Sequence, residues 1–298
     1  MSVRTEGRGS GTEGRGPGSR TAGPVPAPRA TGRPRVHRLA ALVPRTEWAY
    51  RPRIAATAFV VGTQVFLYVV LWRALYGEGT GRVAGMDADQ AVSYSVLATL
   101  MGTGRVILEG ASQETAQSKI RDGSVVFWFT RPVSARRYCA WRGFGESLYA
   151  TAWLLTGLAV GVATGLVEAA PTFAAGATAA LSYVLGQVVF YQIGLLVDLT
   201  SFWTITSYGV TRLAAFAQVL LSGALIPLWF FPGWLEAGAS HLPFAATVHV
   251  PVSLFTGRIP VADAVPYLAE QFAWCLVLAL LSRLMWRRAA RRLLVLGG

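Results

Sequence analysis

The stretch SGALIPLWFFPGW, residues 222–234, breaks a segment that would otherwise be long enough to cross a membrane. Residues 213–235 carry no charge, yet Pro227 and Pro232 interrupt the far end of this segment. A proline removes a backbone hydrogen bond and kinks or ends a helix. Because the chain stays apolar beyond both prolines, a solvated loop does not explain the break.

The apolar continuation, residues 232–260, is divided by prolines and too short in each piece for a full crossing. Non-helical backbone is tolerated at membrane depth when protein covers it. We therefore expect one or two short helices that dip into the outer leaflet and return as a re-entrant hairpin. The alternative is an external cap that packs over the helix bundle.

The composition indicates a polytopic membrane protein. Of 298 residues, 53% are hydrophobic and only 14% are charged, whereas soluble domains carry about 25% charged residues. The net charge of +12 comes from arginines that cluster in linkers and tails, so it does not predict a nucleic-acid partner. Two cysteines and three scattered histidines indicate neither a disulfide framework nor a metal site.

We predict an all-α integral membrane protein with six transmembrane helices, because six stretches contain roughly 20 mainly apolar residues each. The second is the weakest, since Arg105 lies near one end and must reach the interface. The predicted spans are about 54–74, 90–109, 145–167, 173–197, 207–230 and 262–285.

Basic residues set the orientation. The segment before the first span holds 11, the linker 109–143 holds six and the segment after residue 282 holds five. Cytoplasmic loops carry the excess of Lys and Arg, so an even number of spans places all three regions in the cytoplasm. The prediction is a multi-pass plasma-membrane protein with both termini inside the cell.

Three cytoplasmic segments have distinct compositions. Residues 1–36 are rich in Gly, Arg and Pro and are expected to be a disordered tail. Residues 37–53 mix apolar and basic side chains, which suits a helix lying on the inner membrane surface or a structured linker. Residues 117–138 enclose the aromatic run 127–129, which suits a short helix that meets a soluble partner or the membrane surface.

Polar side chains recur at helical spacing within the spans. Tyr183, Gln187 and Tyr191 share one helix face. Such faces line a substrate path between subunits or form interhelical hydrogen bonds worth about 0.6 kcal/mol each. A carboxylate inside a span is costly, so it is either functional or a bonded carboxylate in the outer leaflet. The candidate path residues are Gln64, Tyr68, Tyr183, Gln187, Tyr191, Gln218, Ser222 and Glu270.

Two sets of residues carry a family resemblance. The linker has Ile120, Gly123, Thr130–Arg131–Pro132 and Tyr138, and the broken region has Ser222–Gly223, Ile226–Pro227–Leu228, Phe231–Pro232, Pro243–Phe244, Pro251 and Gly257. In order and spacing, over residues 38–292, they resemble the permease subunits of type-2 ABC exporters. The resemblance is to the bacterial branch often encoded beside antibiotic-resistance or natural-product genes. The Arg/Gly-rich N-terminal segment has no counterpart there.

The resemblance implies that the linker between spans two and three couples the chain to an ATP-binding cassette ATPase. It also implies a re-entrant hairpin over residues 227–257. The other implied partners are membrane lipids and a second permease subunit, identical or homologous. The implied coupling residues are Ile120, Arg121, Gly123, Phe127, Trp128, Phe129 and Arg131. The implied hairpin residues are Pro227, Pro232, Pro243, Phe244, Pro251 and Gly257.

The ATP site is expected in another chain. A phosphate-binding Walker loop needs Gly-x-x-x-x-Gly-Lys-Ser/Thr, and the single lysine, Lys119, lies in no such loop. The chain is therefore predicted to hold no cofactor and to be no enzyme, with ATP and Mg bound by the partner ATPase.

The function expected from the resemblance is export of an amphipathic or hydrophobic substrate, such as a drug, a natural product or a lipid-like molecule. An ATP-independent secondary transporter is one alternative, but it would favour matching helix breaks in two repeats, and the sequence has one break. An integral membrane lipid enzyme would need converging acid, base or metal-binding residues, and these are scarce.

Overall fold

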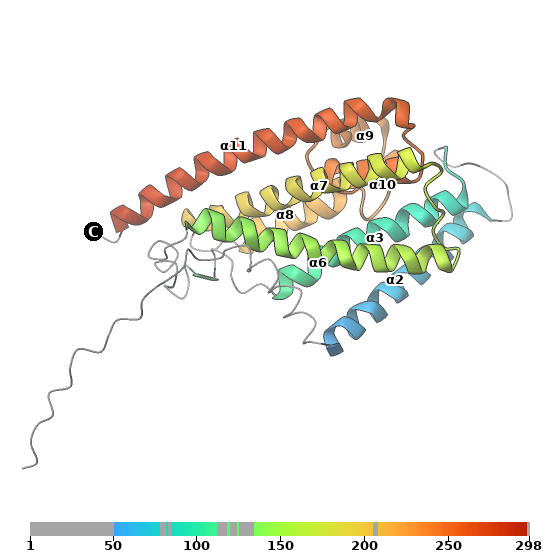
Figure 1. Ribbon diagram of the computed structural model, residues 1–298, viewed down its shortest axis with the longest axis horizontal. Helices are drawn as coiled ribbons and strands as arrows, with labels where there is room; N and C mark the ends of the chain where they lie inside the picture. The colour runs from blue at the N-terminus through green and yellow to red at the C-terminus, as the bar shows by residue number, and fades with distance from the viewer. Residues whose placement is uncertain are drawn as a thin grey trace, which may run out of the picture. The chain divides into compact units, whose positions relative to one another are not determined.

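The computed structural model describes residues 51–77, 82, 85–111, 118–119, 124, 134–204 and 208–296. These segments form helices, with no strand among them (Figure 1). The helices are α2 (Arg51–Tyr76), α3 (Ala88–Ala111), α6 (Ala135–Ala163), α7 (Phe173–Leu199), α8 (Tyr208–Leu221), α9 (Gly233–Ser240), α10 (His249–Phe255) and α11 (Ala264–Leu296). The expectations for residues 1–36 and for most of 117–138 lie outside the described residues. Of the predicted surface segment 37–53, residues 37–50 also lie outside them, and residues 51–53 begin α2.

Four helices of the described chain are long and apolar enough to cross a membrane. They cover Pro52–Tyr76, Ala135–Ala163, Phe173–Phe202 and Val261–Arg291. The prediction of an all-α, multi-pass membrane protein is confirmed at this level. The second and fifth predicted crossings, 90–109 and 207–230, fall on α3 and α8, which this criterion does not include. With 14 residues, α8 is about 21 Å long, shorter than the roughly 30 Å hydrocarbon core.

Helix α3 differs from the four spans because protein surrounds its first half. Each residue from 91 to 101 is buried, and α3 packs against α2, α6 and α10. Two of its serine side chains bind protein groups: Trp72 Nε1 donates to Ser95 Oγ at 2.7 Å, and the Glu168 backbone N donates to Ser93 Oγ at 3.1 Å. A helix covered in this way does not need the hydropathy of a lipid-facing one.

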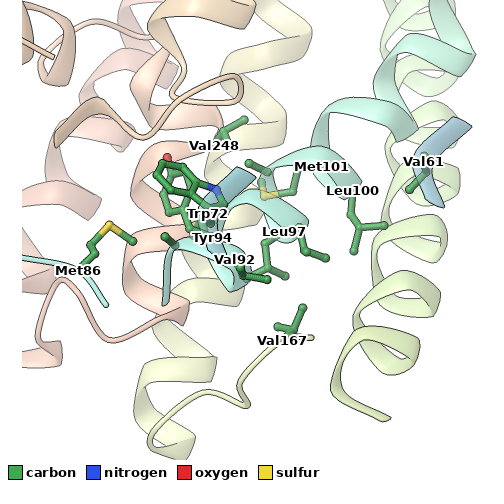
Figure 2. Packing of buried hydrophobic residues seen from close by; sticks show 14 of the residues in the cluster. Val61, Trp72, Met86, Val92, Tyr94, Leu97, Leu100, Met101, Val167 and Val248 are labelled. Atoms are coloured by element: carbon green, nitrogen blue, oxygen red, sulfur yellow. The ribbon is translucent and has the colours of Figure 1, made fainter. Parts of the chain in front are cut away.

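The core around α3 is the largest cluster of buried hydrophobic residues in the described chain. Figure 2 shows Trp72, Tyr94, Leu97 and Met101 at its centre. Trp72 comes from α2 and Tyr94 from α3, and Val248 joins them from the segment before α10. The broken region is therefore part of the main core.

Helix α7 forms a second packing region, in which it lies against α11, α10 and the 3-10 turn Ala245–Thr247. Gly186 allows this turn to lie close against the backbone of α7. A Cβ at this position would lie 2.7 Å from the carbonyl oxygen of Ala246 and 3.3 Å from Cα of Thr247. Since the obstructing atoms are backbone, only glycine lets the turn lie directly on α7.

The break in the predicted fifth span, 207–230, lies earlier than the prolines. Helix α8 ends at Leu221, and Gly223 follows with φ +76°, in the left-handed region that favours glycine. A Cβ on Gly223 would lie 2.7 Å from the Tyr94 hydroxyl oxygen. The prolines instead begin the next elements: Pro227 precedes the 3-10 turn Leu228–Phe230, and Pro232 precedes α9.

Candidate functional site at the helix break

The segment after α8 forms two short helices with opposite surroundings. Helix α9 exposes Trp234 (77%) and buries only Ala239. Helix α10 is buried along nearly its whole length and packs against α7 and α3. The buried residues of α10 are His249, Val250, Pro251, Val252, Ser253 and Leu254. One arm of the segment is thus an interior element of the protein.

A hydrogen-bonded group joins α3 to both sides of the break. The hydroxyl of Tyr94 donates to the carbonyl oxygen of Gly223 at 3.1 Å and lies 3.2 Å from Nδ1 of His249. A carbonyl only accepts, so the single hydroxyl hydrogen goes to Gly223 and His249 Nδ1 is the donor to Tyr94. The backbone N of His249 donates to the carbonyl oxygen of Ser222 at 3.0 Å.

His249 is neutral in this environment. It lies in α10, outside the four candidate spans, and burial lowers its pKa to about 4. A neutral imidazole with its hydrogen on Nδ1 satisfies the contact with Tyr94 without placing a charge in the core. The side chain therefore acts as a fixed hydrogen-bond donor near neutral pH.

Aromatic and cationic contacts extend this group to the loop before α3. The Trp229 ring centroid lies 4.5 Å from that of His249 and 5.6 Å from that of Tyr94. Arg258 places its guanidinium 5.1 Å from the Trp229 ring centroid and donates to the carbonyl oxygen of Gly85 at 2.6 Å. Such cation–π contacts are worth about 0.5–1 kcal/mol when exposed.

Two glutamine side chains hold the turn before α10. Nε2 of Gln271, from α11, donates to the carbonyl oxygens of Ala246 (2.7 Å) and Ser182 (3.2 Å). Nε2 of Gln218, from α8, donates to Oγ1 of Thr247 at 2.7 Å. These bonds join α7, α8 and α11 through the broken segment. Because the turn is deeply buried, the carbonyl of Ala246 needs the donor that Gln271 supplies.

The predicted stripe of α7 lies toward α6. The Tyr183 hydroxyl lies 3.2 Å from Oγ1 of Thr151. The Tyr191 ring lies against Gly143, where a Cβ would be 2.3 Å from the ring. Gln187 is buried, and its Nε2 has no hydrogen-bond partner among the described residues.

The other predicted path residues are distributed around the break. Gln218 and Ser222 belong to the network described above, and the Tyr68 hydroxyl donates to the carbonyl oxygen of Leu225 at 3.2 Å. Gln64 is exposed on α2. Glu270 is a bonded carboxylate, with Oε1 3.1 Å from Nδ1 of His241. That these residues line a substrate path stays a prediction.

The predicted hairpin residues are spread over the whole broken segment. Pro227 and Pro251 are buried, Pro232 is exposed, and Pro243 and Phe244 are half-buried. Gly257 has φ +71°, and a Cβ there would lie 2.9 Å from Cγ of Pro171.

The predicted coupling residues cannot be placed. Ile120, Arg121, Gly123, Phe127, Trp128, Phe129 and Arg131 all lie outside the described residues. Among the described residues, no group of three or more His, Cys, Asp and Glu side chains is arranged to hold a metal ion.

The sequence pointed to the region of the break but missed the side chains that hold it. Tyr94, His249 and Arg258 come from elements far apart in the chain, and nothing in their local sequence links them. Gln271 did carry a signal, because an amide within an apolar helix favours an interhelical hydrogen bond. Gly186 carried none, since its role depends on the turn that lies against it.

Apolar helices of spanning length packed around a buried, broken helix define a multi-pass membrane protein. The sequence profile of the family described as ABC-2 family transporter protein matches residues 61–297. The chain therefore belongs to the ABC-2 transporter family, as the resemblance predicted. Membership implies a transport subunit rather than an enzyme and, in general, an ABC ATPase as partner. No curated protein and no solved structure matches the chain.

Proposed function

We propose that the chain is the permease subunit of an ATP-driven exporter that moves an amphipathic or hydrophobic molecule out of the cell. The observation that carries this proposal is the family match over residues 61–297. The packing of the broken segment into the core supports it. The substrate is a drug, a natural product or a lipid-like molecule. A second permease subunit, identical or homologous, completes the substrate path, and membrane lipid surrounds the two subunits.

Six crossings with both termini in the cytoplasm agree best with the helices. Helix α3 has 24 residues, about 36 Å, and is a crossing whose polar side chains face protein. Helix α8 is a partial crossing that the re-entrant hairpin, 227–257, continues. The arginines before α2, in the linker after α3 and at the end of α11 then share one compartment.

Helix α3 gives the proposed coupling a physical route. Its C-terminal end, Ala111, leads into the linker 117–138, which we assign to the ATPase contact. Tyr94, near its other end, binds both sides of the break. These two points are 17 positions apart, about 25 Å along a rigid helix. Movement of the linker on ATP binding would thus be transmitted to the hairpin.

Assembly with the ATPase tests the linker assignment. We expect the permease with Arg121→Glu and Arg131→Glu and with residues 127–129 deleted to lose co-purification of the ATPase. The matched control is Arg73→Glu with Arg82→Glu, in the segment assigned to the opposite side, which should retain the complex. Full assembly of the linker variant would show that the ATPase docks elsewhere.

Transport in proteoliposomes tests the energy source. The reconstituted complex should move a fluorescent amphipathic dye only with hydrolysable ATP. A Walker lysine variant of the ATPase should abolish movement. Dye movement driven by an ion gradient through the permease alone would overturn the proposal in favour of a secondary transporter.

A further inference from the structure

Helix α11 continues well beyond the predicted end of the last span at about residue 285. It runs from Ala264 to Leu296, 33 residues, or about 50 Å, compared with a hydrocarbon core of roughly 30 Å. The arginines at its C-terminal end therefore stand on a continuous helix and have fixed positions relative to the span.

One face of α11 is buried along its length. Its buried members are Ala264, Gln271, Cys275, Leu278, Ser282 and Ala289, and Gln192 of α7 donates to the carbonyl oxygen of Cys275. This face lies toward α7, against which α11 packs.

The arginines occupy the opposite side. At about 100° per residue, Arg283, Arg287, Arg288 and Arg291 lie roughly 100–160° around the helix from Ala289, and all four are exposed. Within the described chain, none of the four is paired with a carboxylate.

The arginine side of α11 also carries exposed leucines. Leu276, Leu280 and Leu284 are each exposed by 42–58%, and the helical repeat places them within about 60° of Arg287. On the side turned away from α7, this leucine stripe is suited to contact with the acyl chains of the bilayer. Arg283 lies level with Leu284, and Arg287, Arg288 and Arg291 lie about 4.5–10 Å beyond it along the axis, toward the headgroup layer.

We propose that this surface, which we call the arginine face (Arg283, Arg287, Arg288 and Arg291), is a binding site for anionic lipid headgroups. Basic residues next to a span attract anionic lipid, and arginine guanidinium groups bind phosphate through paired hydrogen bonds. An acidic protein surface is the other candidate partner. The arginine face favours lipid, because it continues the lipid-facing leucines on the side turned away from α7. The proposal does not depend on the direction or energy source of transport.

The test uses the full chain in nanodiscs of phosphatidylcholine with or without phosphatidylglycerol, with retained lipid measured by native mass spectrometry. We expect the wild type to retain phosphatidylglycerol selectively. We expect R283Q/R287Q/R288Q/R291Q to lose about tenfold or more of this preference, given a contribution near fivefold from each basic residue at an anionic surface. The all-lysine variant, R283K/R287K/R288K/R291K, keeps the charge and should retain most of it.

The matched control is R4Q/R8Q/R15Q/R20Q, which removes four charges from the N-terminal segment and should leave the preference within about twofold. Equal loss in both glutamine variants would overturn the proposal, because net charge and not the arginine face would then set lipid retention. Unchanged lipid retention with loss of ATPase assembly would overturn it as well, and would assign the arginine face to the protein partner.

Discussion

Helices α8 and α10 lie on the two sides of the same break, yet their surroundings are opposite. The 14 residues of α8 include no buried residue, whereas six of the seven in α10 are buried. Both segments are apolar, and the sequence alone assigns both to the membrane. Apolarity shows that a segment avoids water, but not whether lipid or protein covers it.

The side chains of the two helices reflect the difference. Helix α8 exposes Leu213, Phe216 and Val219. Helix α10 contains polar side chains whose bonds are internal, such as Ser253, which donates to the carbonyl oxygen of His249. Lipid provides no hydrophobic force between helices, so close packing and internal hydrogen bonds select small and polar residues.

The largest difference between α8 and α10 is expected when a leucine side chain is removed from each helix. Leu254→Ala in α10 empties a site that is fully buried, and we expect a loss of about 2–5 kcal/mol in the free energy of unfolding. Leu213→Ala in α8, where the side chain is 70% exposed, should change it by less than about 0.5 kcal/mol. Thermal unfolding in detergent measures both. Equal losses would mean that a protein surface also covers α8.

Two glycines of α7 give the next largest effect. Gly186→Ala places a Cβ against the backbone of Ala246 and Thr247, and we expect overpacking to cost about 1–3 kcal/mol. Gly194→Ala places its Cβ where no atom lies within 4 Å, and the higher helix propensity of alanine should be neutral or stabilising, by up to about 1 kcal/mol. The readout is the unfolding midpoint of the two variants in the same detergent. A stable Gly186→Ala variant would contradict the close contact between α7 and the turn.

These contrasts show what the sequence could and could not predict. Hydropathy over windows of spanning length predicted α2, α6, α7 and α11, because each is apolar over the length of a span. It also located the break to within a few residues. It assigned the break to Pro227, however, whereas the helix ends at Leu221, ahead of a glycine with positive φ.

The side chains around the break were predictable only in part. Gln218 and Ser222 were selected as polar residues within an apolar span, and both take part in holding the broken segment. Tyr94 and His249 were not selected, because their bond joins positions 155 residues apart. A single sequence contains no record of such a pairing. Long-range contacts of this kind, rather than local pattern, determine which apolar segment becomes the interior of the protein.

The smallest expected effect comes from two tyrosine hydroxyls that donate to nearby backbone carbonyls just beyond α8. Tyr94 binds Gly223 at 3.1 Å in the core, and Tyr68 binds Leu225 at 3.2 Å at the surface. Tyr94→Phe leaves Nδ1–H of His249 and the carbonyl of Gly223 buried without this partner, so we expect a loss of about 1–2 kcal/mol. Tyr68→Phe should cost about 0.5 kcal/mol or less, because its acceptor remains accessible.

The unfolding midpoints of the two phenylalanine variants provide the measurement, and His249→Ala provides the control for the coupling. If Tyr94 and His249 act as one unit, the double variant Tyr94→Phe, His249→Ala should lose less stability than the sum of the two single variants. Strict additivity would show that α3 and α10 are held by apolar packing alone. The difference in burial between α8 and α10 would then follow from the packing of apolar side chains, because the hydrogen bonds across the break would contribute nothing to it.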